Sequence, residues 1–137
     1  MTQFHRIVLL AAFAGGATLA QAADVHASGA GAQAAAFQCG GVGVGEQDRM
    51  KADAANHDLM LTFATPGGAY VADVDVEIRR GAQVVLRGHC GGPLLLADLA
   101  PAGRYEVQAT SKGRVQRKAV TIGGSRPARL SFVWPED

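Results

Sequence analysis

Short runs of alternating apolar and polar residues fill the chain from His57 onward, and they constrain its fold more than any other feature. In residues 70–80 the even positions from 72 to 78 are apolar, and the odd positions from 73 to 79 are charged. Successive side chains of a β-strand point to opposite faces, so this run predicts a strand that buries one face and exposes the other.

Turn signals divide the same region into further candidate strands. Glycine and proline clusters such as TPGGA, GGP, PAG and SKG separate runs at 57–64, 83–90, 94–99, 104–110, 114–122 and 128–134. About seven short strands in this arrangement predict a mainly β chain whose residues 57–137 fold as an antiparallel β-sandwich. Four residues on the apolar phases of their strands are expected in the core: Val76, Tyr105, Leu130 and Trp134.

The residues between positions 37 and 56 follow a different pattern. Residues 37–45 contain four glycines, which favours a loop or an irregular edge strand. Residues 46–56 are rich in helix formers and carry Glu46 and Asp48 in their first turn, where the helix dipole favours acidic groups. We predict one short helix there, before the sandwich begins.

The first 22 residues have the three parts of a cleavable signal peptide. His5 and Arg6 give a positive start, residues 7–19 are apolar, and Ala20 and Ala22 supply the small residues before a cleavage site at Ala23. The apolar run is shorter than the ~18 residues that a membrane helix needs, so no stable membrane anchor is expected. We predict a bacterial protein that is periplasmic or secreted.

Residues 23–36, between this signal and the rest of the chain, are mostly alanine and glycine without periodic apolar positions. That composition is typical of a flexible linker.

The chain has two cysteines, Cys39 and Cys90. In an oxidising compartment two thiols usually pair, which predicts a disulfide that would stabilise the protein by roughly 4 kcal/mol. The alternative is a small metal site built from both cysteines with His57 and His89. Its spacing matches no common metal motif, and neighbouring strand residues such as His89 and Cys90 point to opposite faces.

The sequence lacks the patterns of known catalytic and cofactor sites. It has neither the paired His/Glu motif of metallopeptidases nor the G-x-S-x-G turn of serine hydrolases. The stretch 40–45 fails the dinucleotide pattern because Glu46 stands where glycine is needed. We therefore expect a chain without enzyme activity or cofactor. Its formal net charge of +1 gives no general attraction to nucleic acid, so no such partner is expected.

Charge is unevenly distributed along the chain. One predicted strand exposes the acidic residues Asp73, Asp75 and Glu77. The basic residues cluster later, at Arg114, Lys118, Arg126 and Arg129, with Gln116 on the same strand phase. If the two strands are neighbours, their charges pair within the molecule, which is the simpler expectation. If they lie apart, the two faces can pair between molecules, weakly and in a salt-dependent way.

Residues 70–110 resemble the carboxypeptidase regulatory-like domain, in which a strand leads to a Leu-x-Pro-x-Gly-x-Tyr turn. The matching residues are Leu99, Pro101, Gly103 and Tyr105. The resemblance covers residues 57–134 and extends to small exported bacterial proteins that carry such a domain. It implies an immunoglobulin- or transthyretin-like sandwich that serves as a non-catalytic companion module.

The expected function is therefore that of a non-enzymatic exported binding or structural module. Its expected partner is a protein or a carbohydrate of the cell envelope. The alternative is a small periplasmic metal-binding protein that uses Cys39, Cys90 and His89.

Overall fold

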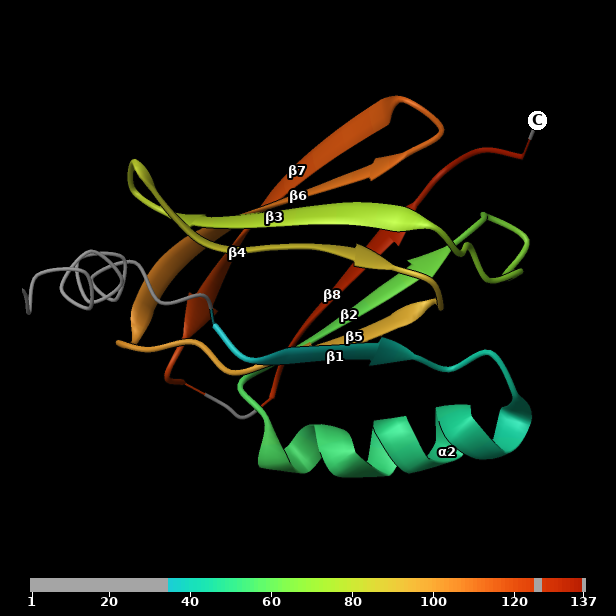
Figure 1. The fold of residues 1–137 in the computed structure, drawn as a ribbon, viewed down its shortest axis with the longest axis horizontal. Helices are drawn as coiled ribbons and strands as arrows, with labels where there is room; N and C mark the ends of the chain where they lie inside the picture. The colour runs from blue at the N-terminus through green and yellow to red at the C-terminus, as the bar shows by residue number, and fades with distance from the viewer. Residues whose placement is uncertain (1–34, 125–126, 137) are drawn as a thin grey trace, which may run out of the picture. The chain divides into compact units, whose positions relative to one another are not determined.

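Two four-stranded sheets face each other and enclose the core of the protein (Figure 1). The structure is a computed structural model that describes residues 35–124 and 127–136. The predicted signal peptide, its cleavage site at Ala22 and Ala23, and the linker up to position 34 lie outside the described residues. So does Arg126 of the basic cluster.

The strands divide evenly between the sheets. The first sheet has the order β1-β5-β2-β8, with β1 (Phe37–Gly40), β5 (Leu94–Ala97), β2 (Leu59–Ala64) and β8 (Ala128–Val133). The second has the order β4-β3-β6-β7, with β4 (Gln83–Cys90), β3 (Val74–Arg80), β6 (Gly103–Ser111) and β7 (Arg114–Ile122). The predicted mainly β sandwich is thus confirmed, with eight strands among the described residues instead of about seven.

One strand pair departs from the antiparallel prediction. β2 and β8 run parallel, whereas the other neighbouring pairs are antiparallel. The physical reason is the crossover before β8, because the chain leaves β7 in one sheet and enters the other sheet at the end where β2 also begins. Sequence periodicity reports which face of a strand is buried, and it is silent on this direction.

The alternation in β3 produces the core as predicted. Val74, Val76 and Ile78 are almost fully buried between the sheets, as are Tyr105 and Trp134. Two expectations about core residues need correction. Leu130 is only half-buried, because β8 is an edge strand, and Ala72 is exposed because it precedes β3.

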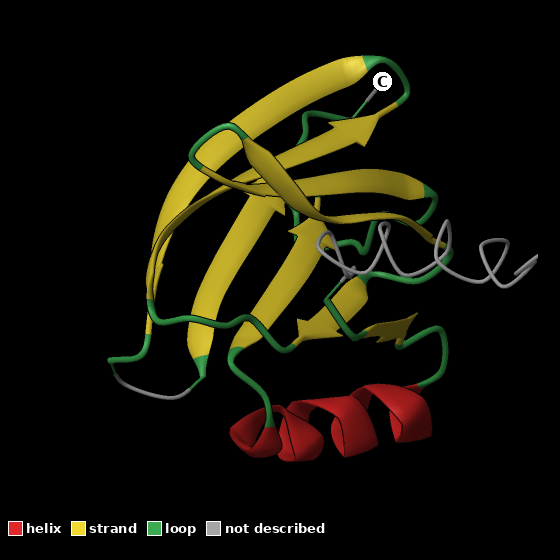
Figure 2. Ribbon diagram, turned by 60° about the vertical axis from the view of Figure 1, so that its left-hand side comes forward, coloured by secondary structure: helices red, strands yellow, loops and turns green. Residues whose placement is uncertain are grey.

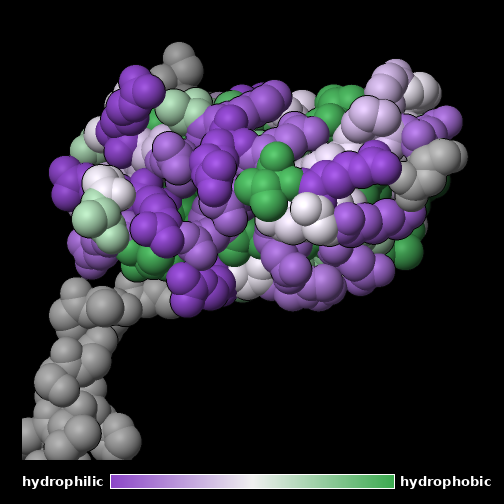
Figure 3. Space-filling model, turned by 90° about the horizontal axis from the view of Figure 1, so that it is seen from above, coloured by the Kyte–Doolittle hydropathy of each residue, from purple (hydrophilic) through white to green (hydrophobic). Residues whose placement is uncertain are grey.

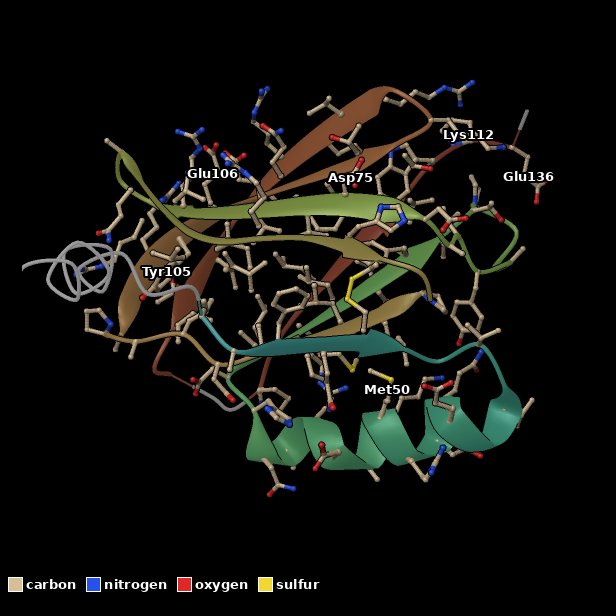
Figure 4. All side chains as sticks on the ribbon, in the orientation of Figure 1. Met50, Asp75, Tyr105, Glu106, Lys112 and Glu136 are labelled. Carbon is tan, nitrogen blue, oxygen red and sulfur yellow. A yellow bond between two sulfur atoms is a disulfide. The ribbon has the colours of Figure 1, made fainter. Side chains whose placement is uncertain are left out.

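The predicted helix covers the outer face of the first sheet (Figure 2). It comprises α2 (Val44–Asp53) and a 3-10 turn, η2 (Ala54–Asn56), so it begins two residues earlier than expected. Met50 points from the helix toward the sheet (Figure 4), and with Ala54 it packs on the outward side chains of β2 and β5. That second small core explains why Leu94 and Leu96 are buried although they face away from the main core.

The disulfide prediction is confirmed. Cys39 of β1 and Cys90 of β4 are bonded, with Cα atoms 5.3 Å apart, and they join the edges of the two sheets. Farther along the same side of the sandwich, the amide of Ala35 donates to the carbonyl of Val85 on β4 at 2.8 Å. Of the residues 37–45, predicted as a loop or an edge strand, 37–40 form the edge strand β1, 41–43 form a loop, and 44 and 45 belong to α2.

The opposite side of the sandwich is closed by side chains. Arg114, Gln116 and Lys118 of β7 donate to the backbone carbonyls of residues 135, 133 and 131, in antiparallel register. These bonds satisfy carbonyls on β8 that another chain could otherwise pair with. The basic phase of β7 thus has a role inside the fold that the sequence pattern did not indicate.

The outer face of the second sheet is mostly hydrophilic (Figure 3). β6 separates β3 from β7, so the expected pairing between their charges is wrong. The acidic phase of β3 pairs mainly with β4 instead, because β4 is its other neighbour. Glu77 accepts hydrogen bonds from Arg87 of β4 and from Arg79 of its own strand, and Asp75 contacts His89.

Candidate binding cleft at one end of the sandwich

The turn motif of residues 99–105 braces the end of the sandwich where β6 begins. Leu99 is buried, and the Tyr105 hydroxyl donates to the carbonyl of Pro101 at 2.6 Å. Gly103 has a φ of +144°, a conformation that side chains rarely adopt. A tyrosine that bonds back to the preceding turn is a known brace of β-sandwich corners. These four residues are thus occupied with holding the fold.

A cleft of about 390 Å³ opens at the other end of β6, where Figure 4 labels Lys112 and Glu136. That volume falls in the range of small-molecule binding sites. Three segments that are distant in sequence line it: the loop between β2 and β3, the β6–β7 hairpin, and the chain after β8. The lining residues are Thr65, Tyr70, Val71, Ala72, Asp73, Ser111, Lys112, Arg114, Trp134, Pro135 and Glu136.

The loop after β2 places an aromatic side chain at the rim. The amide of Thr65 donates to the carbonyl of Ala69, and the amide of Gly68 donates to the carbonyl of Thr65, which closes the TPGGA turn. Tyr70 then pairs with Ala64 in an isolated β-bridge. The Tyr70 side chain is 43% exposed. Lys51 of α2 donates to its hydroxyl at 3.1 Å and lies 5.7 Å from the ring centroid, so the helix helps to position the ring.

Two residues of the cleft have left-handed backbones. Asp73 has a φ of +59° and Lys112 a φ of +49°, and among the described residues they are the non-glycine positions with positive φ. Such conformations are unfavourable for residues with a Cβ, and they concentrate at functional sites. Both left-handed non-glycine positions of the described chain line the same cleft. Lys112 forms the two-residue turn of the β6–β7 hairpin with Gly113, a turn whose favoured geometry has a positive φ at both positions.

The floor of the cleft is rigid and apolar. Trp134 packs against Phe63 and Phe132, with ring centroids 6.1 Å away in both cases, and its indole N–H donates to the carbonyl of Arg114 at 3.0 Å. Above this floor Glu136 accepts a hydrogen bond from Thr65 at 3.1 Å. The lining therefore combines an aromatic floor with charged groups of both signs.

His89 connects the wall of the cleft to the outer face of the second sheet. Its Nε2 lies 3.2 Å from Asp73 Oδ1, and its Nδ1 lies 2.8 Å from Asp75 Oδ1. The hydrogen bond to Asp75, and to a smaller extent the one to Asp73, raise the pKa of His89 above its ordinary value of 6.5. The imidazole is thus held between two carboxylates, one of which lines the cleft.

His57 has the same arrangement at a different place. Its Nε2 lies 3.0 Å from Asp53, at the end of α2, and its Nδ1 lies 3.1 Å from Asp98, after β5. Partial burial lowers the pKa of His57, but the hydrogen bonds to Asp53 and Asp98 outweigh it and leave the pKa raised. This histidine fastens the helix to the sheet that it covers.

The structure contradicts the metal-binding alternative, because the cysteines it requires cannot act as ligands. Both sulfurs are bonded to each other, so neither Cys39 nor Cys90 offers a thiolate. His89 and buried Cys90 point to opposite faces, as expected, and the carboxylates near His89 sit on different ring nitrogens. Over residues 35–124 and 127–136, no group of three or more histidine, cysteine or acidic side chains is arranged to hold a metal ion.

Sequence reasoning recognised parts of this end of the molecule without assembling them. It identified the TPGGA and SKG turns, the burial of Trp134 and the exposure of Asp73 and Asp75. It considered His89 as a possible metal ligand and did not predict its contacts to two aspartates. The two turns that flank the cleft were its available signal, because loops at one end of a sandwich commonly carry binding residues.

Comparisons with known proteins add little about activity. The chain matches no family model and no curated protein sequence. Nine chains of solved structures match it, among them the 5-hydroxyisourate hydrolase of Klebsiella pneumoniae. That match is 18% identical, has a TM-score of 0.45, and covers 56% of this chain and 88% of that one. Separately, no helix in the described part of the chain is long and apolar enough to cross a membrane.

Proposed function

We propose that this chain is a non-enzymatic binding module of the bacterial cell envelope that takes its ligand in the cleft beside Tyr70 and Trp134. The observation that carries the proposal is the convergence at this cleft of both left-handed non-glycine residues with a half-exposed tyrosine. Binding residues commonly lie on loops that a scaffold positions, and left-handed non-glycine residues concentrate at such sites. As part of the same proposal, the chain is exported from the cell and belongs to the carboxypeptidase regulatory-like family.

The chemistry of the cleft favours binding over catalysis. A serine nucleophile is commonly activated by a neighbouring histidine that has a free ring nitrogen. The serine of the cleft, Ser111, is buried, and both nitrogens of His89 already face carboxylates. These contacts support a role in which the cleft recognises a ligand without changing it.

A carbohydrate of the envelope is the ligand class that the lining suits best. Sugar hydroxyls both donate and accept hydrogen bonds, so they match a lining with carboxylates at Asp73 and Glu136 and cations at Lys112 and Arg114. The ring of Tyr70 offers an apolar surface for the C–H groups of a sugar. A protein partner is the other possibility that the sequence left open.

The test is a glycan array probed with the purified exported chain, followed by calorimetry on each hit. Tyr70→Ala and Glu136→Gln should each weaken binding at least roughly tenfold, as loss of a contact worth ~1.4 kcal/mol does. Arg104→Ala, an exposed change on the outer face of β6 near the opposite end, is the matched control and should leave affinity unchanged. Capture of a peptide ligand at the same cleft would replace the carbohydrate by a protein partner. Hits that are insensitive to both cleft variants would refute the assignment of the site.

A further inference from the structure

We propose that His89 is a proton-controlled latch that holds residues 71–73, one wall of the cleft, in place. The latch regulates the cleft described above, so it rests on the proposed binding function. His89 itself is a positioning residue, because it acts on the ligand site through Asp73.

The geometry of the latch is a single imidazole between two carboxylates of one segment. Asp75 belongs to β3, directly opposite His89 on β4. Asp73 lies two residues earlier, outside the strand, where its φ of +59° turns the chain into the cleft wall. The contact to Asp75 is 2.8 Å and the contact to Asp73 is 3.2 Å. His89 thus fastens a strained turn to the adjacent strand.

Protonation decides whether both contacts can exist together. An imidazolium carries two N–H donors, one for each carboxylate, whereas a neutral imidazole has one donor and one lone pair. After deprotonation one carboxylate must face the lone pair. The shorter bond to Asp75 retains the proton, so Asp73 loses its hydrogen bond from His89.

Among the charged groups around His89, Asp73 and Asp75 are the ones that contact its ring and favour its protonated form. From β3, Asp75 and Glu77 face the same side of the sheet, but Glu77 is bound by Arg79 and Arg87. From β4 itself the nearest charge on that face is Arg87, which is committed to Glu77. From β6 the residue opposite Asp75 is the uncharged Thr110.

Release of Asp73 loosens the cleft in a predictable direction. The left-handed backbone at Asp73 is unfavourable on its own, so it persists while the side chain is anchored. Ligand affinity should therefore be highest at acidic pH and fall as pH rises through the titration of His89. The raised pKa of His89 places that change above pH 6.5.

The wall can be followed without any ligand, because Trp134 is the one tryptophan of the sequence and forms the floor of the cleft. In the full exported chain, acrylamide quenching of Trp134 should increase between about pH 6 and pH 8.5. The backbone amide shifts of residues 71–73 should change with the same midpoint as the ring carbons of His89. Amides that ignore the titration of His89 would overturn the latch.

Two variants should fix the latch in opposite states. Asp73→Asn tolerates a left-handed backbone, and its amide can donate to the lone pair of neutral His89, so quenching should stay low at every pH. His89→Ala removes the clamp, so quenching should stay high at every pH. His57→Gln removes the other clamped histidine and should preserve the wild-type response. A pH response that survives in His89→Ala would also overturn the proposal.

Binding measurements separate this inference from the function on which it rests. For a glycan identified on the array, affinity at pH 5.5 should exceed that at pH 8.5 by roughly fivefold or more, and Asp73→Asn should abolish the difference. Glycan binding without pH dependence would refute the latch and keep the binding function. If residues 71–73 respond to the titration of His89 but no glycan or peptide binds, the binding function is refuted and the pH-dependent movement of the cleft wall stands.

Discussion

Reduction of the Cys39–Cys90 disulfide should lower the free energy of unfolding by about 4 kcal/mol. The bond closes a loop with a sequence separation of 51 residues. In the chain-entropy relation, closing a loop of that length lowers the conformational entropy of the unfolded chain by roughly 14 cal/mol/K, which corresponds to about 4 kcal/mol at 25 °C. A small domain has only ~5–15 kcal/mol of stability in total, so the loss is a large share of it.

The folded state should survive this change. β1 keeps its ladder to β5, and the amide of Ala35 still donates to Val85 on β4. The loss of stability should therefore come mainly from the higher conformational entropy of the unfolded chain. Unfolding should then occur at a lower denaturant concentration and remain cooperative.

Urea unfolding followed by Trp134 fluorescence is the appropriate assay. With a denaturant slope of ~2 kcal/mol/M, the midpoint should fall by roughly 2 M when reductant is added. The double variant Cys39→Ala/Cys90→Ala should unfold near the reduced protein and should not respond to reductant. A midpoint shift below about 0.5 M would refute the reasoning, because it would mean that the loop hardly restricts the unfolded chain.

Three further predictions test other parts of the structure. Gly92→Ala should destabilise the fold by ~1–3 kcal/mol in urea melts, because an added methyl group would stand 2.3 Å from a carbonyl of β1, whereas Gly91→Ala meets nothing within 4 Å and should be nearly neutral. Val76→Asp places an unpaired charge in the core at a position that is 2% exposed, so the chain should not show a cooperative melt by circular dichroism. A histidine whose pKa is raised by folding contributes stability that is present below pH 6.5 and lost as pH rises through the folded-state pKa. Wild-type melting temperature should therefore decline above about pH 6.5. His57→Gln should make that decline smaller, with His89 accounting for part of the remainder, and an identical decline in the variant would mean that His57 does not contribute.

The sandwich was predictable because its strands are amphipathic in a simple way. In β3 and β6 the side chains at alternate positions are buried, which is the pattern that the sequence displays directly. β5 was harder to interpret, because Leu94 and Leu96 face the helix while Leu95 and Ala97 face the main core. A strand buried on both sides shows no alternation, so its sequence could not reveal that the helix covers it.

The candidate site was not predictable for a related reason. Its residues come from two ordinary turns and from the chain after β8. The left-handed backbone of Asp73 has no sequence signature beyond a residue type that tolerates it. His89 contacts aspartates that lie 14 and 16 residues away in the sequence. They become neighbours only through the register in which β3 pairs with β4. Periodicity showed these aspartates on an outer face, and it did not show which strand would lie beside them.

The brace of the fold and the proposed binding cleft lie at opposite ends of β6. At its start, the Tyr105 hydroxyl and Gly103 brace the turn from Pro101, and these groups are occupied within the fold. At its far end, about 27 Å away for a nine-residue strand, the chain passes into Ser111 and Lys112 at the cleft. Loop changes at the cleft end therefore leave the brace at the other end untouched.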